Sequence, residues 1–317
     1  MAGLNILVTF FAAALCLSQL VRYLGKKLLP SRLHVCTVSE LAGAFQLGAC
    51  TLELRMLMEI GMWGGGFGPD VNMTLLFLLF VAHGFTFSGA SANSVVSVQE
   101  FLKRDCPLID TLAKLLSQYA GMAAANLVTS WYWTLELTEF HTIQNMMAQD
   151  CSPALQTPLH QGVFVEGLCA FCYLLVIQRF QRIKLIYRVP VTALTVTLLV
   201  FTAGSYTGAF FNPTLAYILT FHCPGKTFQE YALVYWGGSL IGMVLALFIY
   251  EGNVPLLFQK NLLYSQKGKY RTPKGKTLQA SSPTASNDAK SPAKKRNKQN
   301  KDQSKNEKKL KANTVAD

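Results

Sequence analysis

GASANSV at residues 89–95 and GAFFNPT at residues 208–214 are the two stretches that decide the fold, and they lie 119 residues apart. Each follows an apolar segment long enough to cross a bilayer and precedes one that is too short to do so. Backbone that turns back at membrane depth must line a cavity or be buried in protein. We therefore expect re-entrant half-helices near residues 94–103 and 213–222.

Outward from these stretches, the chain contains apolar segments of membrane-spanning length. The six predicted spans are residues 33–54, 71–87, 109–133, 162–177, 189–206 and 231–250. A further apolar run at 4–21 precedes a basic cluster that begins at Arg22, and it is expected to be a retained helix rather than a signal peptide.

Three helices separate the two stretches, so the two halves of the chain run in opposite directions. Inverted repeats with short broken helices are typical of transport proteins. The expected fold class is an all-α multi-pass membrane protein. It would contain six transmembrane helices and two re-entrant half-helices in an inverted repeat, with an extra N-terminal helix.

The composition excludes several classes of protein. The chain is 51% hydrophobic and 15% charged, with a mean hydropathy of +0.27, whereas soluble domains are about 25% charged. Of the net charge of +12, +11 comes from residues 265–317, which hold 15 Lys or Arg against 4 Asp or Glu. The nearly neutral, apolar body indicates neither a soluble enzyme nor a nucleic-acid-binding domain.

The basic residues also indicate an orientation. They crowd the connectors at 103–104 and 179–188 and the C-terminal tail, and none occurs in residues 115–178. The positive-inside rule then places these connectors and the C-terminus in the cytosol, and the polar loop 136–160 on the other side.

The chain is expected to have three regions. Residues 1–32 form an N-terminal apolar helix and basic connector, and residues 33–262 form the membrane domain. Residues 263–317 are rich in Lys and nearly free of large apolar residues, which predicts a disordered tail that lies on anionic lipid.

Asn93 and Asn212 suit the place where two half-helices meet. Asparagine caps helix N-termini, and its amide offers hydrogen-bond donors to a pore. Pro213 suits a first helical position, where its missing N–H is not needed. Two opposed half-helices aim the positive ends of their dipoles at the centre, which is a barrier to protons and cations.

Each half carries a carboxylate near the middle or start of its first predicted helix, Glu40 and Glu166. Carboxylates are costly in a bilayer, so we expect both to face the interior and to accept hydrogen bonds from the backbone around Asn93 or Asn212. The alternatives are exposure near a helix end and, less favoured, a proton relay.

Eight cysteines are too few and too scattered for a disulfide scaffold. Six lie in or beside apolar runs and are interpreted as small buried hydrophobic residues, namely Cys16, Cys36, Cys50, Cys169, Cys172 and Cys223. Cys106 and Cys151 lie in predicted loops. The five histidines are dispersed, and no nucleophile–base spacing or phosphate loop occurs. We therefore expect no enzyme, metal site, cofactor or nucleic-acid partner.

These motifs resemble the major intrinsic proteins, and among them the unorthodox aquaporins (superaquaporins). The resemblance is carried by MAGLN at 1–5, TLLFLLF at 74–80, GASANSVVSVQEFL at 89–102, FFNP at 210–213 and NLLYSQKGKYRTPKGK at 261–276. Cys223, nine residues past Thr214, matches a cysteine typical of this branch. The resemblance implies an aquaporin-like channel domain over 33–262, a homotetramer, and residence in an intracellular membrane such as the endoplasmic reticulum or vesicles.

In the family, two Asn-Pro-Ala boxes meet at the pore centre. By resemblance, the pore constriction comprises Asn93, Ser94, Val95, Asn212, Pro213 and Thr214. Ser94 and Val95 depart from the family pattern and make the constriction bulkier and more apolar. The expected outer filter comprises Met73, Val200, Ala209 and Leu215. Leu215 stands where orthodox members carry an arginine, and Glu40, Glu166 and Cys223 are expected to be structural.

The predicted function is a passive channel for water and for small neutral solutes such as glycerol or hydrogen peroxide. One alternative is a non-conducting or gated membrane scaffold that works through its basic tail. Another is a coupled secondary transporter, although coupling usually needs carboxylates at the midplane, where Asn93 and Asn212 are uncharged.

Overall fold

The computed structural model describes residues 2–61, 68–147, 151–252, 254 and 256. The elements are α1 (Ala2–Leu28), α2 (Arg32–Gly61), α3 (Pro69–Thr86), α4 (Ser94–Leu102), α5 (Leu108–Trp133), α6 (Glu139–Met146), α7 (Leu159–Phe180), α8 (Leu185–Thr207), α9 (Pro213–Thr220), α10 (Phe228–Tyr231), the π-helical η1 (Ala232–Gly238) and α11 (Ser239–Glu251). All described residues belong to one unit, Met1–Arg271. The predicted tail 263–317 lies outside the described residues.

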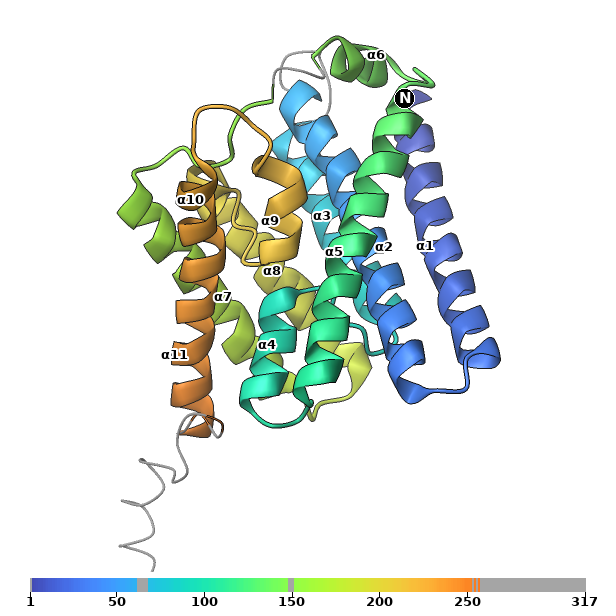
Figure 1. Ribbon diagram of the computed structural model, residues 1–317. Helices are drawn as coiled ribbons and strands as arrows, with labels where there is room; N and C mark the ends of the chain where they lie inside the picture. Colours follow the sequence, from blue (N-terminus) through green and yellow to red (C-terminus); the bar gives the residue numbers. More distant parts are fainter. Residues whose placement is uncertain (1, 62–67, 148–150, 253, 255, 257–317) are drawn as a thin grey trace, which may run out of the picture. The chain divides into compact units, whose positions relative to one another are not determined.

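Two short helices lie among the long ones. Figure 1 shows α4 and α9 reaching toward each other from opposite ends of the bundle. The first half consists of α2, α3, α4 and α5, and the second of α7, α8, α9 and the continuous run from α10 to α11. The predicted fold class is therefore confirmed, including the inverted repeat of half-helices.

The two ends of the bundle differ in charge. The α1–α2, α4–α5 and α7–α8 turns lie together at the end opposite α6 (Figure 1). We call this the basic end, because its turns and helix ends carry Lys26, Lys27, Arg32, Lys103, Arg104, Arg179, Arg182, Lys184 and Arg188. The other is called the α6 end.

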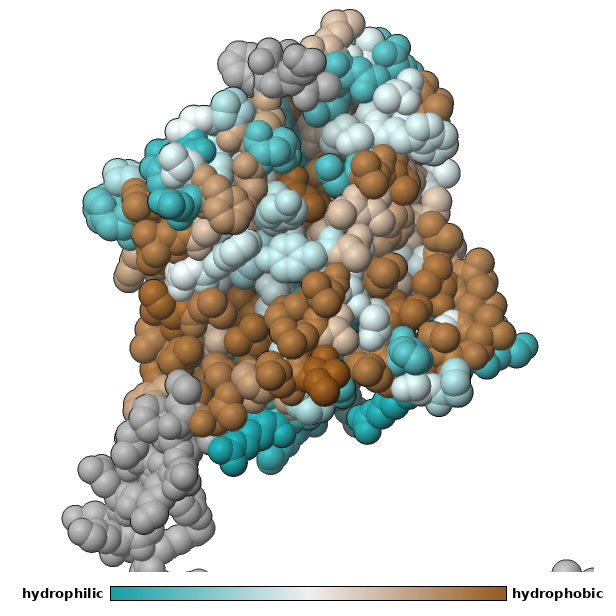
Figure 2. Space-filling view, in the orientation of Figure 1, coloured by the Kyte–Doolittle hydropathy of each residue, from teal (hydrophilic) through white to brown (hydrophobic). Residues whose placement is uncertain are grey.

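The outside of the bundle suits a bilayer. Figure 2 shows a brown apolar band between teal polar rims. Six helices are long and apolar enough to cross a membrane, within α1, α2, α3, α7, α8 and α10–α11. The remaining long helix, α5, contributes exposed apolar side chains such as Leu116 and Leu127. These surfaces are those of a multi-pass membrane protein.

The extra N-terminal helix is built into the bundle. Leu7, Phe11 and Ala14 of α1 pack in one cluster with side chains of α2 and α3. Arg22, only 1% exposed, donates to the carbonyl oxygen of Thr86 and to Oε1 of Gln46. Arg22 is therefore not part of a surface basic cluster, because its fork of donors is used inside the protein.

Glycines allow two helix pairs, one in each half, to cross in backbone contact. A Cβ added at Gly121 of α5 would overlap the carbonyl oxygen of Leu41 in α2. In the other half, a Cβ at Gly242 of α11 would overlap the carbonyl oxygen of Gly167 in α7. Small residues at crossings are how membrane helices approach closely.

Replacing Gly242 by alanine is expected to destabilise the bundle by about 1–3 kcal/mol, because overpacking forces the two backbones apart. The measurement is SDS-induced unfolding in mixed micelles. Gly237→Ala is the matched control, since its Cβ would meet only the Leu233 side chain, at 3.4 Å. Equal effects of the two substitutions would contradict this account of the crossing.

The structure differs from the predicted elements in two places. The loop 136–160 contains the helix α6, whose N-cap Thr138 accepts a hydrogen bond from the backbone N–H of His141. Buried Glu53 fixes this helix by accepting from the Trp133 indole at 2.6 Å and contacting the His141 ring at 3.1 Å. The last predicted span begins as α10 and a π-helical turn, at the point where Gly238 contacts α7.

Candidate functional site

Both asparagine loops adopt the same unusual backbone. In the first loop, Gly89 has φ 97° and Ala92 has φ 49°. At the equivalent positions of the second, Gly208 has φ 84° and Phe211 has φ 35°. Glycine tolerates this left-handed region, but alanine and phenylalanine reach it only at a cost in free energy. The residue before each asparagine therefore has to be held by its surroundings.

Two buried carboxylates hold these loops. Glu40, 2% exposed, accepts from the backbone N–H groups of Ser91 and Ala92, both at 2.9 Å. Glu40 also accepts a hydrogen bond from the side-chain amide of Gln118 on α5, at 2.9 Å. Buried polar groups need partners, and here the partners are the irregular backbone itself.

Glu166 does the same in the second half. Its oxygens accept from the backbone N–H groups of Phe210 at 3.1 Å and Phe211 at 2.7 Å. The Thr207 hydroxyl adds a third hydrogen bond at 2.6 Å. The contacts match those expected from the sequence, and both carboxylates lie inside the protein rather than near a helix end.

The asparagines bond each other's loop. The Asn93 amide donates to the carbonyl oxygen of Phe211 at 3.2 Å, and the Asn212 amide donates to that of Ala92 at 2.8 Å. Their oxygens serve the half-helices: Asn93 caps α4 by accepting from the Val95 N–H, whereas Asn212 accepts from the Thr214 hydroxyl. The two half-helices therefore meet at this pair of residues.

A cavity of about 2440 Å³ includes this meeting point in its lining and draws residues from both ends of the bundle. Its lining includes Lys103 and Arg188 at the basic end, Asn93 and Asn212 in the middle, and Arg55 at the α6 end. The expected filter residues also line it, namely Met73, Val200, Ala209 and Leu215. All four are uncharged, so this stretch offers few hydrogen bonds to a passing solute.

Four of the six expected constriction residues do not line the cavity. These are Ser94, Val95, Pro213 and Thr214, which are all buried. They begin the half-helices. Val95 packs with Leu174 of α7 and Met243 of α11, and the Thr214 hydroxyl donates to Oδ1 of Asn212. Val95 therefore does not narrow the cavity, and the prediction that this residue makes the constriction bulkier is wrong.

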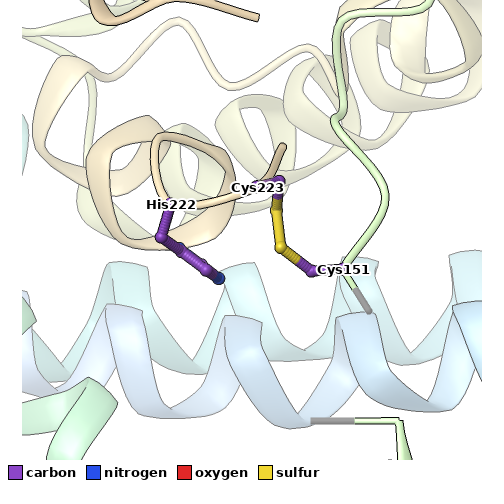
Figure 3. Close-up of side chains that lie close together, drawn as sticks. All are labelled: Cys151, His222 and Cys223. Atoms are coloured by element: carbon purple, nitrogen blue, oxygen red, sulfur yellow. A yellow bond between two sulfur atoms is a disulfide. The ribbon is translucent and has the colours of Figure 1, made fainter. Parts of the chain in front are cut away.

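Cys223 is not a simple buried hydrophobic residue, because it forms a disulfide with Cys151, 72 residues earlier. Figure 3 shows the disulfide with His222 beside it. The three potential ligand atoms lie within 4.8 Å of one another, a cluster that the dispersed spacing of the histidines does not predict. Metals bind the thiolate form of cysteine, which neither sulfur has while the disulfide is formed.

The positive charge of Arg55 at the α6 end was not predicted from the sequence. Partial removal from water and, secondly, the charge of Arg55 lower the pKa of His222 below its ordinary value. Arg55 belongs to α2, and the signal that could have revealed it is its position. It directly follows the predicted span 33–54, far from the other basic residues of the chain body. This is the end of the span that the positive-inside rule predicts to face away from the cytosol.

Similar proteins are known over most of the chain. Residues 31–250 match the family described as Major intrinsic protein. Aquaporin-12 of Mus musculus is 50% identical over 276 residues, which cover 87% of this chain and 95% of that protein. Putative aquaporin-12B of Homo sapiens is 47% identical over 294 residues (93% and 94%), and Aquaporin-11 of Homo sapiens is 28% identical over 247 residues (78% and 89%). The resemblance drawn from the motifs is confirmed, toward the aquaporin-12 type.

Proposed function

Because the chain belongs to the major intrinsic protein family and is a membrane channel rather than an enzyme, we propose that its cavity is a passive pore for water and for small neutral solutes such as glycerol or hydrogen peroxide. The observation that carries this proposal is the pair of amides of Asn93 and Asn212 on the wall of a cavity that is lined by residues from both ends of the bundle.

Each amide can serve a passing water molecule. An asparagine NH₂ group has two donor hydrogens, and one of them is used in the bond to the opposite loop. The second is then free to donate to a water oxygen that has given up its bulk neighbours. Because both loops are fixed by Glu40 and Glu166, these donors are held in place before the solute arrives.

Cations are repelled at the point where Asn93 and Asn212 meet. α4 and α9 both begin at the centre of the cavity, so the positive ends of their dipoles face a solute there. The uncharged filter residues cannot replace the hydration shell of an ion. These features favour neutral solutes, and a cavity lined by residues from both ends of the bundle favours conduction over a scaffold role.

We extend the proposal to location and assembly. The basic end would face the cytosol together with the C-terminus, because lysine and arginine concentrate on the cytosolic side of membrane proteins. Similarity to aquaporins supports a homotetramer with one pore per subunit, in an intracellular membrane such as the endoplasmic reticulum. The Lys-rich tail would lie on anionic lipid. The division into 1–32, 33–262 and 263–317 is part of the same proposal.

The test is stopped-flow light scattering on proteoliposomes of the full chain, with water and glycerol gradients. We expect faster shrinkage than in empty vesicles, and Asn212→Asp should lower the water permeability at least about tenfold, which corresponds to a barrier about 1.4 kcal/mol higher. Aspartate is acceptor-only, so it loses the bond to Ala92 and presents a charge to the cavity.

Asn5→Asp is the matched control, because Asn5 is exposed on α1; it should conduct like the unmodified chain. If the unmodified chain and Asn5→Asp, each eluting as a single species, both leave the water permeability at the value of empty vesicles, the pore is overturned. A scaffold that works through its tail would then be favoured.

A further inference from the structure

Arg55 occupies a special place in the cavity. Among the described residues that line it, Arg55 is the only lysine or arginine at the α6 end. The expected filter positions are uncharged, so any fixed positive charge that a solute meets at this mouth comes from Arg55. In a cavity with low-dielectric walls, such a charge acts strongly because the field lines are focused.

The side chain is held rather than mobile. Its Nη1 donates to the carbonyl oxygen of Leu219 at the end of α9 at 2.7 Å, and its Nη2 to that of Ser152 at 3.4 Å. The guanidinium also lies 5.8 Å from the centre of the Phe210 ring, a cation–π contact. Phe210 belongs to the loop that leads to Asn212, so Arg55 connects the mouth with the filter region.

The carboxylate beside Arg55 is more strongly screened than the guanidinium. Arg55 forms an ion pair with Glu59, four residues later on α2, with 2.5 Å between Nε and Oε1. The Glu59 side chain is 51% exposed and that of Arg55 18%, so water screens the carboxylate more than the guanidinium. Glu59 also lines the cavity, but of this pair Arg55 carries the less screened charge.

We propose that Arg55 is the charge-selecting residue of the pore, which repels cations at the α6 mouth before they reach the apolar filter; this inference rests on the proposed channel function. Its position on α2 supplies, from a different helix, the positive charge that Leu215 cannot supply from α9. Arg55 does not hinder the passage of water, because the guanidinium does not repel a neutral molecule.

The test measures water and methylammonium flux in the same proteoliposomes of the full chain. Arg55→Gln should keep the water flux and raise the methylammonium flux about tenfold or more, because glutamine still offers a donor to Leu219 but no charge. Arg55→Lys keeps the charge and should exclude methylammonium as the unmodified chain does. Arg182→Met, at an exposed residue of the basic end that does not line the cavity, is the control for net charge.

An Arg55→Gln protein that conducts water yet shows the unmodified methylammonium flux would overturn the proposal. Unmodified protein that conducts no water at all would overturn the channel function itself, and the inference with it. The two failures are therefore distinguishable within one data set.

A second measurement covers the case in which Arg55→Gln does not fold. Met73→Cys places a thiol in the cavity at the same end, and its reaction with cationic and anionic methanethiosulfonate reagents is compared with that of the chain without this cysteine. With Arg55→Met, the cation-to-anion ratio of labelling rates should rise about tenfold. An unchanged ratio would overturn the role of Arg55 whatever the flux.

Discussion

Replacing Glu166 by alanine is expected to destabilise the bundle by about 2–6 kcal/mol, because two buried backbone N–H groups lose their acceptor and each costs about 1–3 kcal/mol when left unpaired. These are the N–H groups of Phe210 and Phe211, in a loop that also holds a left-handed φ at Phe211. The measurement is SDS-induced unfolding in mixed micelles, followed by intrinsic tryptophan fluorescence.

The controls separate the loss of these bonds from the loss of a charge. Glu139→Ala removes an exposed carboxylate from α6 and should change the free energy of unfolding by less than about 0.5 kcal/mol. Glu166→Gln keeps one acceptor oxygen and should fall between the two. Glu40→Ala should resemble Glu166→Ala, because Glu40 accepts from the equivalent backbone groups of the first loop. If Glu166→Ala unfolds like Glu139→Ala, the carboxylate does not support the loop.

The spans, the half-helices and the partners of the two carboxylates could be predicted from the sequence. Hydropathy and length define a membrane helix, and a short apolar stretch after GAxxN can only turn back. Once Glu40 and Glu166 fall in apolar spans, the high cost of an unpaired carboxylate leaves few partners other than the irregular loops.

The remaining features depend on contacts between distant segments, which hydropathy does not encode. The pairing of Cys151 with Cys223 joins a loop to the end of a half-helix, and Arg55 meets Leu219 from 164 residues away. The side-chain direction of Val95 is likewise set by the face that α4 presents to α7 and α11. The motif places Val95 two residues after Asn93 in the chain, but only the packing of α4 shows that its side chain lies away from the cavity.

Removing the disulfide between Cys151 and Cys223 is the second change expected to have a large effect on the free energy of unfolding. Cys223→Ser is expected to lower the free energy of unfolding by up to about 4 kcal/mol, because a cross-link over a loop of this length restricts the unfolded chain strongly. Cys151→Ser and the double substitution should give the same loss, since each removes the one bond, and reducing agent should bring the unmodified chain to their level. Cys106→Ser, at a free cysteine, is the control. Additive losses from the two single substitutions would mean that the cysteines act separately.

Loss of the disulfide should leave cation exclusion intact below the unfolding transition. The segment that follows Cys151 has its own anchors, because the Ala154 N–H donates to the Thr220 hydroxyl at 2.9 Å and the Gln156 N–H to the Tyr206 carbonyl oxygen at 2.9 Å. The carbonyl of Ser152 therefore stays within reach of Arg55, whose stronger bond is to Leu219 in any case. Methylammonium flux through Cys151→Ser should match that of the unmodified chain; a rise to the level of Arg55→Gln would mean that the disulfide, and not the half-helix, positions the guanidinium.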